Sequence, residues 1–216
     1  MKFVKQTKNN SKFLLVVLMF TAISLNYACK KQEDVSIDKI NNGEISYLPM
    51  AVGKYWIYQI SDIDENGDAT SQGYDSTYIS GTKEINGNSY FEFRSTYIPN
   101  YNQYFRDSAS YIVNETGERF FCHKNDKDTL LNEKVVNFGY LIKHTYRVIH
   151  MLDKQVECVA GNFPAIEIRH SILYPLFNKN DISHFYYSPN IGIVLHKEAT
   201  TLVGTTRVFS LMRWGK

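Results

Sequence analysis

The chain has 216 residues, of which 44% are hydrophobic, and its 24 Lys and Arg residues face 22 Asp and Glu residues. The 188 residues after position 28 are enough for one ordinary domain with a hydrophobic core. Four of the basic residues lie among the first 12, so the chain after residue 28 holds 20 basic and 22 acidic residues, a net charge of −2. That balance excludes the strongly basic surface of a typical nucleic-acid-binding domain, and we expect no nucleic-acid partner.

The first 28 residues have the three parts of a secretory signal peptide. Residues 1–12 carry four lysines and no acid, residues 13–25 form an apolar run, and Ala28 is a small residue at the expected cleavage position. The apolar run is shorter than the roughly 20 residues that a membrane-spanning helix needs. The sequence therefore predicts export and removal of residues 1–28.

Cys29 is the predicted site of lipid attachment. Ala28 matches the small residue before the cysteine of a bacterial lipobox, whereas Asn26 and Tyr27 depart from it, which leaves an ordinary signal-peptidase cut as the alternative. The segment CKKQED that begins at Cys29 resembles the start of many Bacteroidetes lipoproteins. The resemblance implies a palmitate-type anchor in the outer membrane, on its periplasmic side or at the cell surface. Residues 29–42 are then the lipidated cysteine and a flexible, polar spacer.

Residues 43–216 are predicted to form one antiparallel β domain, either a β-sandwich or a strongly curved sheet that approaches a barrel. The segment is rich in Tyr, Phe, Ile, Val and Thr, and turn signals such as Asn86-Gly87 recur at short intervals. No part of it has sustained helical spacing, although residues 126–140 are a candidate for one helical turn. The predicted strands are 54–62, 75–85, 89–98, 104–106, 110–114, 119–124, 145–152, 155–159, 165–173, 184–188, 193–198 and 206–214.

Three short blocks stand out within this domain. Residues 47–58 read YLPMAVGKYWIY, residues 159–163 read VAGNF, and residues 186–194 read YYSPNIGIV. They resemble, in order, the PLxVGNxWxY, xAGxF and YYxPxIGxV motifs of a family of Bacteroidetes outer-membrane lipoproteins whose role is undefined. None of the motifs is catalytic, so the resemblance implies a fold and a location and no mechanism.

Two cysteines, Cys122 and Cys158, remain besides Cys29. An exported protein lies in a compartment that permits disulfides, so the two thiols either pair or stay as separate buried groups.

Three triplets resemble the O-glycosylation motif that Bacteroidetes use on exported proteins. They place the candidate acceptor hydroxyls at Ser76, Ser108 and Thr129, each directly after an aspartate. A glycan needs an exposed acceptor. The alternative is that these pairs are turn-forming residues whose side chains bond the nearby backbone.

No pattern marks a metal, cofactor or catalytic site. Residues 62–68 begin like a calcium loop, but position twelve is Gly73 where a bidentate Glu is required, so an acidic hairpin loop is the better interpretation. The six histidines have no zinc-ligand spacing. Catalytic serine and phosphate-loop motifs are absent from the sequence. We therefore expect no metal, no cofactor and no enzymatic activity.

The sequence favours a membrane-anchored lipoprotein whose β-rich domain has a binding or structural role. A cavity inside the curved sheet would indicate an apolar ligand. A filled core with an exposed aromatic patch, for which Tyr97, Tyr101, Tyr104, Phe105 and Tyr111 are candidates, would indicate a partner protein or a glycan. The alternative is an exported hydrolase with an unmarked active site, which a deep polar cleft with convergent titratable side chains would favour.

Overall fold

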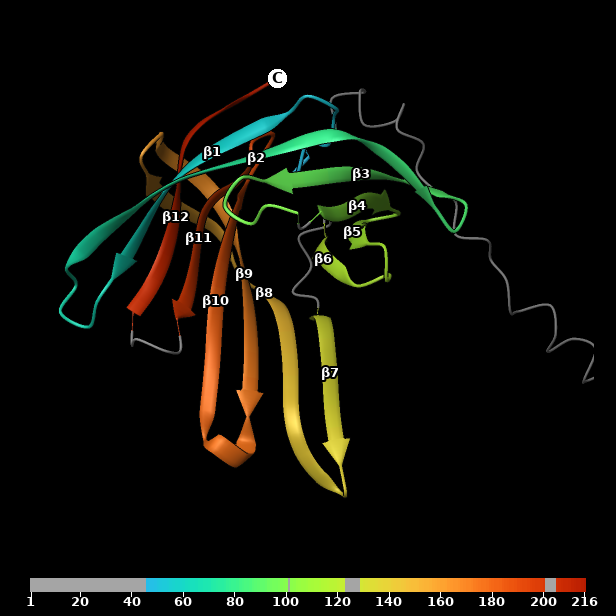
Figure 1. Cartoon of the computed structure of the whole chain (residues 1–216), viewed down its shortest axis with the longest axis vertical. Helices are drawn as coiled ribbons and strands as arrows, with labels where there is room; N and C mark the ends of the chain where they lie inside the picture. The colour runs from blue at the N-terminus through green and yellow to red at the C-terminus, as the bar shows by residue number, and fades with distance from the viewer. Residues whose placement is uncertain (1–45, 101, 123–128, 201–204) are drawn as a thin grey trace, which may run out of the picture. The chain divides into compact units, whose positions relative to one another are not determined.

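The computed structural model describes residues 46–100, 102–122, 129–200 and 205–216 (Figure 1), and these all belong to one compact unit. The predicted signal peptide, Cys29 and the spacer lie outside the described residues. Within the described ranges no helix is both long and apolar enough to cross a membrane.

Twelve strands and one short 3-10 helix make up the described unit. The strands are β1 (Tyr55–Ile63), β2 (Ala69–Ile85), β3 (Asn88–Ser95), β4 (Asn102–Ser108), β5 (Tyr111–Asn114), β6 (Arg119–Cys122), β7 (Thr129–Asn137), β8 (Tyr140–Cys158), β9 (Gly161–Tyr174), β10 (Lys179–Ser188), β11 (Gly192–Thr200) and β12 (Thr205–Gly215). The 3-10 helix η2 (Pro175–Phe177) lies between β9 and β10.

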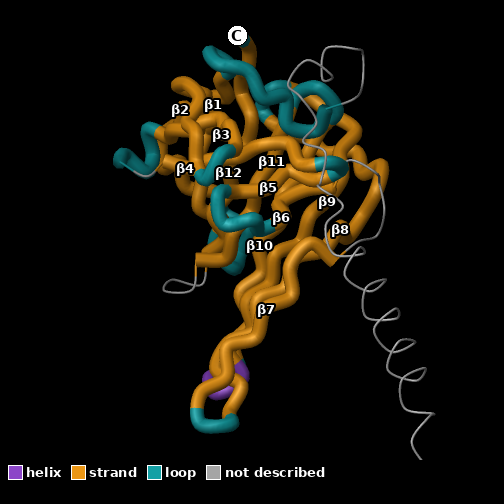
Figure 2. The backbone as a smooth tube through the Cα atoms, turned by 90° about the vertical axis from the view of Figure 1, so that its right-hand side faces the viewer, coloured by secondary structure: helices purple, strands orange, loops and turns teal. Residues whose placement is uncertain are grey.

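All twelve strands form one antiparallel sheet in the order β6-β5-β4-β3-β2-β1-β12-β11-β10-β9-β8-β7. Chain neighbours are therefore sheet neighbours almost throughout, and the first and last strands pair in the middle of the sheet. The two edge strands, β6 and β7, come close to each other, so the sheet is a nearly closed barrel (Figure 2). This confirms the predicted all-β domain, in its strongly curved form.

Arg147 of β8 bridges the seam between the two edges of the sheet. Its Nη1 donates to the carbonyl of Arg119 at the start of β6 at 2.8 Å, and it forms an ion pair with Glu118 at 2.8 Å. Its guanidinium also lies over the ring of Phe120, 4.2 Å from the centroid. Because Arg147 is only 5% exposed, these contacts are needed to offset the desolvation of its charge.

The predicted hairpin signals are confirmed at the turns. Asn86 and Gly87 both adopt positive φ between β2 and β3, as a two-residue hairpin requires. Gly67 and Gly117 have positive φ in the β1–β2 and β5–β6 turns. Asp64 organises the β1–β2 turn by accepting hydrogen bonds from the backbone N–H groups of Asn66 and Asp68.

The expectation of a helical turn within residues 126–140 is wrong, because residues 129–137 form the edge strand β7. Most of β7 is exposed on both faces, so its sequence lacks the alternation that marks a half-buried strand. The segments predicted as separate strands at 145–152 and 155–159 are one long strand, β8, whose register shifts between Met151 and Lys154.

Alternating side chains fill the interior of the barrel. In β1, Trp56, Tyr58 and Ile60 are buried and the residues between them are partly exposed. Trp56 fixes the start of β1 through its indole N–H, which donates to the carbonyl of Ile191 at 2.6 Å. A side chain at Gly192 would place its Cβ 3.0 Å from that indole nitrogen, so only glycine fits at this contact.

Candidate functional site

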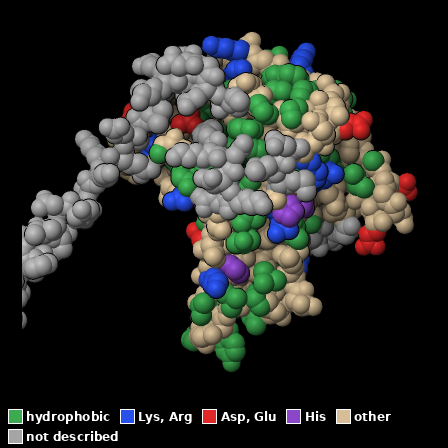
Figure 3. Space-filling view, turned by 180° about the vertical axis from the view of Figure 1, so that it is seen from behind, with side chains coloured by type: hydrophobic (Ala, Val, Ile, Leu, Met, Phe, Trp, Pro, Cys, Tyr) green, Lys and Arg blue, Asp and Glu red, His purple; other side chains and the backbone are tan. Residues whose placement is uncertain are grey.

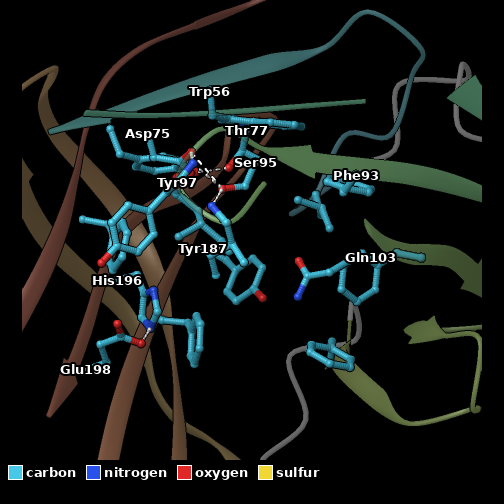
Figure 4. A pocket seen from close by; sticks show the side chains of 18 of the residues that line it. Trp56, Asp75, Thr77, Phe93, Ser95, Tyr97, Gln103, Tyr187, His196 and Glu198 are labelled. Carbon is cyan, nitrogen blue, oxygen red and sulfur yellow. Dashed lines mark hydrogen bonds and ion pairs between the residues drawn. The ribbon is translucent and has the colours of Figure 1, made fainter. Parts of the chain in front are cut away.

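A cavity of about 270 Å³ lies inside the barrel (Figure 4). Nine of the strands, β1 to β6 and β10 to β12, contribute to its wall. Thirteen of the nineteen lining side chains are aromatic or aliphatic, and nine of these thirteen are aromatic. The lining residues are Leu48, Trp56, Tyr58, Asp75, Thr77, Phe93, Ser95, Tyr97, Ile98, Gln103, Phe105, Ile112, Phe120, Phe185, Tyr187, Ile193, His196, Glu198 and Phe209.

Three stacked rings form one wall of the cavity. Phe185, His196 and Phe209 are direct cross-strand neighbours on β10, β11 and β12. The His196 ring lies 4.1 Å from that of Phe185 and 5.2 Å from that of Phe209, and each pair is within 13° of parallel. Because antiparallel register brings these residues onto one face, the three rings stack face to face across the strands and present their edges to the cavity.

His196 is neutral at ordinary pH. Burial and, to a smaller extent, the nearby His170 together lower its pKa to about 4. The pKa of His170 is also lowered to about 4, first by burial and then by the positive charges of Arg147 and Lys143. The Nε2 atom of His196 is buried and lies 3.8 Å from the Glu198 carboxylate, too far for a hydrogen bond, and within the described ranges it has no hydrogen-bond partner (Figure 4). An unsatisfied buried polar atom costs about 1–3 kcal/mol, which a polar group on a bound ligand would recover.

A buried carboxylate, Asp75, organises the part of the wall next to the three stacked rings. Its oxygens accept from the hydroxyls of Thr77 at 2.8 Å and Ser95 at 2.9 Å and from the backbone N–H of Tyr97 at 3.0 Å (Figure 4). The Thr96 hydroxyl donates to the same carboxylate at 3.2 Å. Asp75 is only 5% exposed, so these donors replace its lost water. The network fixes the chain that follows β3, which carries Tyr97 into the cavity wall.

A charged row borders the cavity at the level of Glu198. Arg207 of β12 lies between Asp62 and Glu198 in the register of the sheet and binds Asp62 through both carboxylate oxygens, at 2.7 and 2.8 Å. It also donates to the phenol of Tyr97. The hydrogen bond from Arg207 holds the pKa of Asp62 below its usual range, whereas burial raises that of Glu198. The cavity is therefore apolar in its middle and charged at this border.

A second ionic cluster lies on the other face of the sheet. Glu167 follows Ile166 in β9, points away from the cavity, and accepts from Lys154 at 3.0 Å and from Nδ1 of His184 at 2.7 Å. Burial raises the pKa of Glu167, but the bonds from Lys154 and His184 outweigh it and leave the pKa below its ordinary value. This carboxylate is held ionised, and its contacts tie β8, β9 and β10 together.

The candidate glycosylation residues differ in exposure. Ser108 is 4% exposed at the end of β4, so it does not lie in a polar turn and does not meet the requirement for an exposed acceptor. Thr129 is exposed at the start of β7, and Ser76 is partly exposed within β2. Glycosylation at Thr129 and Ser76 stays a prediction.

The remaining sequence-based candidates do not converge on the cavity. Cys122 and Cys158 are free thiols in the structure, so the two cysteines do not form the disulfide that was one of the two alternatives. Burial raises the pKa of the Cys158 thiol, which makes it a poor nucleophile. No cluster of His, Cys, Asp or Glu suited to a metal occurs among the residues that the structure describes. Asp62, which opens the calcium-like segment, binds Arg207 instead.

The aromatic stretch 97–111 is divided between the two faces of the sheet. Phe105 and Tyr97 line the cavity. Tyr104 faces outward beside Glu92, and Tyr111 packs under Arg119. Tyr101 lies outside the described residues. These residues therefore do not form one exposed aromatic patch.

The three sequence blocks have structural roles in the barrel. Trp56 and Tyr58 of the first block donate to the backbone carbonyls of Ile191 and Ile193 in the third. The backbone N–H of Ala160, in the middle block, donates to the carbonyl of Leu211 on β12. The blocks thus hold strands together around the cavity.

Sequence reasoning missed His196, Asp75 and Gln103 as cavity residues. One weak indication of the ring stack was present in the sequence: Phe185, His196 and Phe209 each lie within a segment predicted as a strand. Aligning them required the register of three strands, which the sequence does not give.

No family model matches this sequence, and neither does any curated protein. Among solved structures, it is similar to a candidate lipoprotein from Parabacteroides distasonis, with a TM-score of 0.46 and 13% identity, covering 79% of this chain and 99% of that one. It is also similar to a candidate exported protein with a YmcC-like fold from Bacteroides fragilis, with a TM-score of 0.41 and 14% identity, covering 78% of this chain and 98% of that one. The function is therefore inferred from this chain's own residues.

Proposed function

We propose that this protein is a lipid-anchored carrier or receptor that binds one small apolar ligand inside its barrel. The observation that carries the proposal is the largely aromatic cavity of about 270 Å³. An apolar cavity of about 150 Å³ holds benzene, so this one suits a ligand of about two fused rings. The ring edges of Phe185, His196 and Phe209 favour an aromatic ligand, because edge-to-face contact is a preferred arrangement of two rings.

Polar groups in the wall favour a ligand with one hydroxyl or similar group. The Nε2 of neutral His196 is available as a partner. Burial raises the pKa of Tyr187 to about 12, so its phenol stays protonated and can donate. The amide of Gln103 points into the same space (Figure 4). A few placed polar groups in an apolar pocket are the usual arrangement for orienting a ligand.

Binding of 2-naphthol, a flat two-ring alcohol, tests this proposal. We expect the full chain to bind it with saturable, one-to-one stoichiometry, followed by naphthol fluorescence. Gln103→Trp places a large ring in the cavity and should weaken binding at least tenfold, which is about 1.4 kcal/mol. Gln103 is exposed at one side of the wall, so this substitution leaves the packed core unchanged.

Gln155→Trp is the matched control for Gln103→Trp. Gln155 is an exposed strand glutamine of β8 beside the buried Val156, and it does not line the cavity. The control should bind like the parent. Equal affinities for all three proteins, or no saturable binding by the parent, would contradict an internal ligand site.

The anchored location belongs to the same proposal. The signal peptide and the CKKQED segment support lipidation of Cys29 and attachment to the outer membrane, on its periplasmic side or at the cell surface. Radiolabelled palmitate is expected to enter the wild-type chain in cells and not Cys29→Ser. Label that persists after the substitution would refute Cys29 as the attachment site.

The hydroxyls that line the cavity do not favour the hydrolase alternative. Ser95 and Thr77 donate to Asp75, which satisfies a buried carboxylate rather than activating a nucleophile. The pair of Glu167 and His184 lies on the opposite face of the sheet from the cavity.

A further inference from the structure

Two neighbouring hairpins end in exposed apolar side chains. The β7–β8 turn carries Phe138, which is 93% exposed, and the β9–β10 connection carries Phe177, which is 75% exposed. Together with their neighbours these residues form what we call the apolar tip. Its members are Val135, Val136, Phe138, Tyr140, Leu173, Leu176 and Phe177.

The two hairpin ends lie side by side at the far end of the long strands β7 to β10. His144 of β8 pairs with Leu173 of β9, and η2 contacts β8. Figures 1 and 2 show both turns projecting together, away from the other strands of the described unit. Figure 3 shows hydrophobic side chains gathered at this end. The apolar tip therefore lies at a protruding end of the described unit.

Folding stability does not explain Phe138. It has φ 48° and is followed by Gly139 at φ 81°, a turn that favours Asn-Gly or Gly-Gly. The β2–β3 hairpin uses Asn86-Gly87 at the equivalent place. A left-handed conformation costs a bulky residue about 1–2 kcal/mol, and exposed Phe138 recovers none of this by burial. Residues that break a local rule without structural gain are expected at functional positions.

The charged residues around the apolar tip indicate which kind of surface it contacts. Residues 134–143 and 173–180 contain three lysines and no acid, and Glu133 and Asp181 lie directly beyond them. Lys179 forms an ion pair with Asp181 at 3.6 Å. Lys134 and Lys143 flank the β7–β8 turn. The end of β1 and the β1–β2 turn, by contrast, contain four acids within residues 62–68. Apolar and aromatic side chains at an apex, with lysines directly behind them, match an anionic lipid surface, where the apolar groups enter the interface and the cations meet the headgroups.

We propose that the apolar tip inserts into the interface of a lipid bilayer. This goes beyond the proposed ligand binding and does not depend on it. Strand β10 runs from the tip at Lys179 to the cavity wall at Tyr187, a span of about 27 Å at 3.4 Å per residue. A bilayer-inserted tip would hold the cavity at that height above the membrane, in addition to the N-terminal anchor.

Tryptophan fluorescence of the full chain in vesicles tests the insertion. The two variants are Phe138→Trp at the apolar tip and Tyr74→Trp on β2, where Tyr74 is 64% exposed. The vesicles contain phosphatidylethanolamine and phosphatidylglycerol with brominated acyl chains, which quench tryptophans that reach them. Both variants carry the same N-terminal segment, and the signal of Trp56 and Trp214 is subtracted with the parent chain.

We expect a blue shift and strong quenching for Phe138→Trp and neither for Tyr74→Trp. The shift should be smaller in vesicles of phosphatidylcholine alone, since the lysines then lack anionic partners. Absence of quenching at position 138 would overturn the proposal. So would a blue shift that appears without vesicles and grows with protein concentration, because the apolar tip would then bind a second copy. Phe138→Ser should leave naphthol binding unchanged, which separates this proposal from the cavity.

Discussion

Trp56→Ala is expected to lower the free energy of unfolding by about 3–5 kcal/mol, the range for deleting a large buried aromatic side chain. Trp56 is 2% exposed, stacks 6.0 Å from Phe93, and donates to the carbonyl of Ile191. The substitution enlarges the cavity and leaves that carbonyl without its donor. Urea denaturation followed by far-ultraviolet circular dichroism measures the loss.

Two further variants separate packing from the hydrogen bond. Trp56→Phe keeps most of the ring and should lose about 1–3 kcal/mol, the cost of a buried group left unsatisfied. Trp214→Ala removes the other tryptophan, which is 36% exposed, and should lose less than half as much as Trp56→Ala. Equal losses for Trp56→Ala and Trp214→Ala would show that the contact between β1 and the β10–β11 turn does not hold the barrel together.

The second large effect is a loss of stability as the pH falls from about 6.5 to about 4. The pKa of His196 is lowered from 6.5 to about 4 in the folded protein, so the unfolded chain takes up its proton first. Its contribution is fully present above pH 6.5 and is lost as the pH approaches 4. At about 1.4 kcal/mol per pKa unit, reduced for partial solvent access, this amounts to about 2–3 kcal/mol.

Other titratable groups also change the stability at acidic pH, some lowering it and one raising it as the pH falls. His170 adds a further loss over the same pH range, because its pKa is also lowered to about 4. Asp62, whose pKa is lowered, contributes only at still lower pH, and Glu198, whose pKa is raised, opposes the loss. His196→Phe retains the stack with Phe185 and Phe209 and should remove most of the His196 contribution. An unchanged pH dependence in this variant would refute the assignment.

The fold could be predicted because most strands are half-buried and separated by strong turn signals. The β1 sequence alternates buried and partly exposed residues, and Asn86-Gly87 marks a two-residue hairpin. Strand β7 was missed because an edge strand exposed on both faces has no such alternation. Strands that bury one face and expose the other could therefore be predicted from the sequence, whereas a strand exposed on both faces could not.

The candidate site could not be predicted, because its residues come together only through register. Asp75, Gln103 and His196 lie on three strands that are far apart in the chain, and nothing in their spacing relates them. The shift of pairing between Tyr186 and Tyr187 shows the difficulty, since a one-residue slip moves every following side chain to the other face. The cavity is also a space left by side chains, which composition does not encode.

Methyl NMR during titration with 2-naphthol tests the internal ligand site most directly. The δ1 methyl groups of isoleucines serve as probes inside and outside the cavity: Ile112 and Ile193 line the cavity, whereas Ile85 and Ile172 do not. We predict saturable shift changes at Ile112 and Ile193, with Ile85 and Ile172 unchanged. Changes confined to Ile85, Ile172 or other residues outside the cavity, with Ile112 and Ile193 unmoved at saturation, would contradict the account.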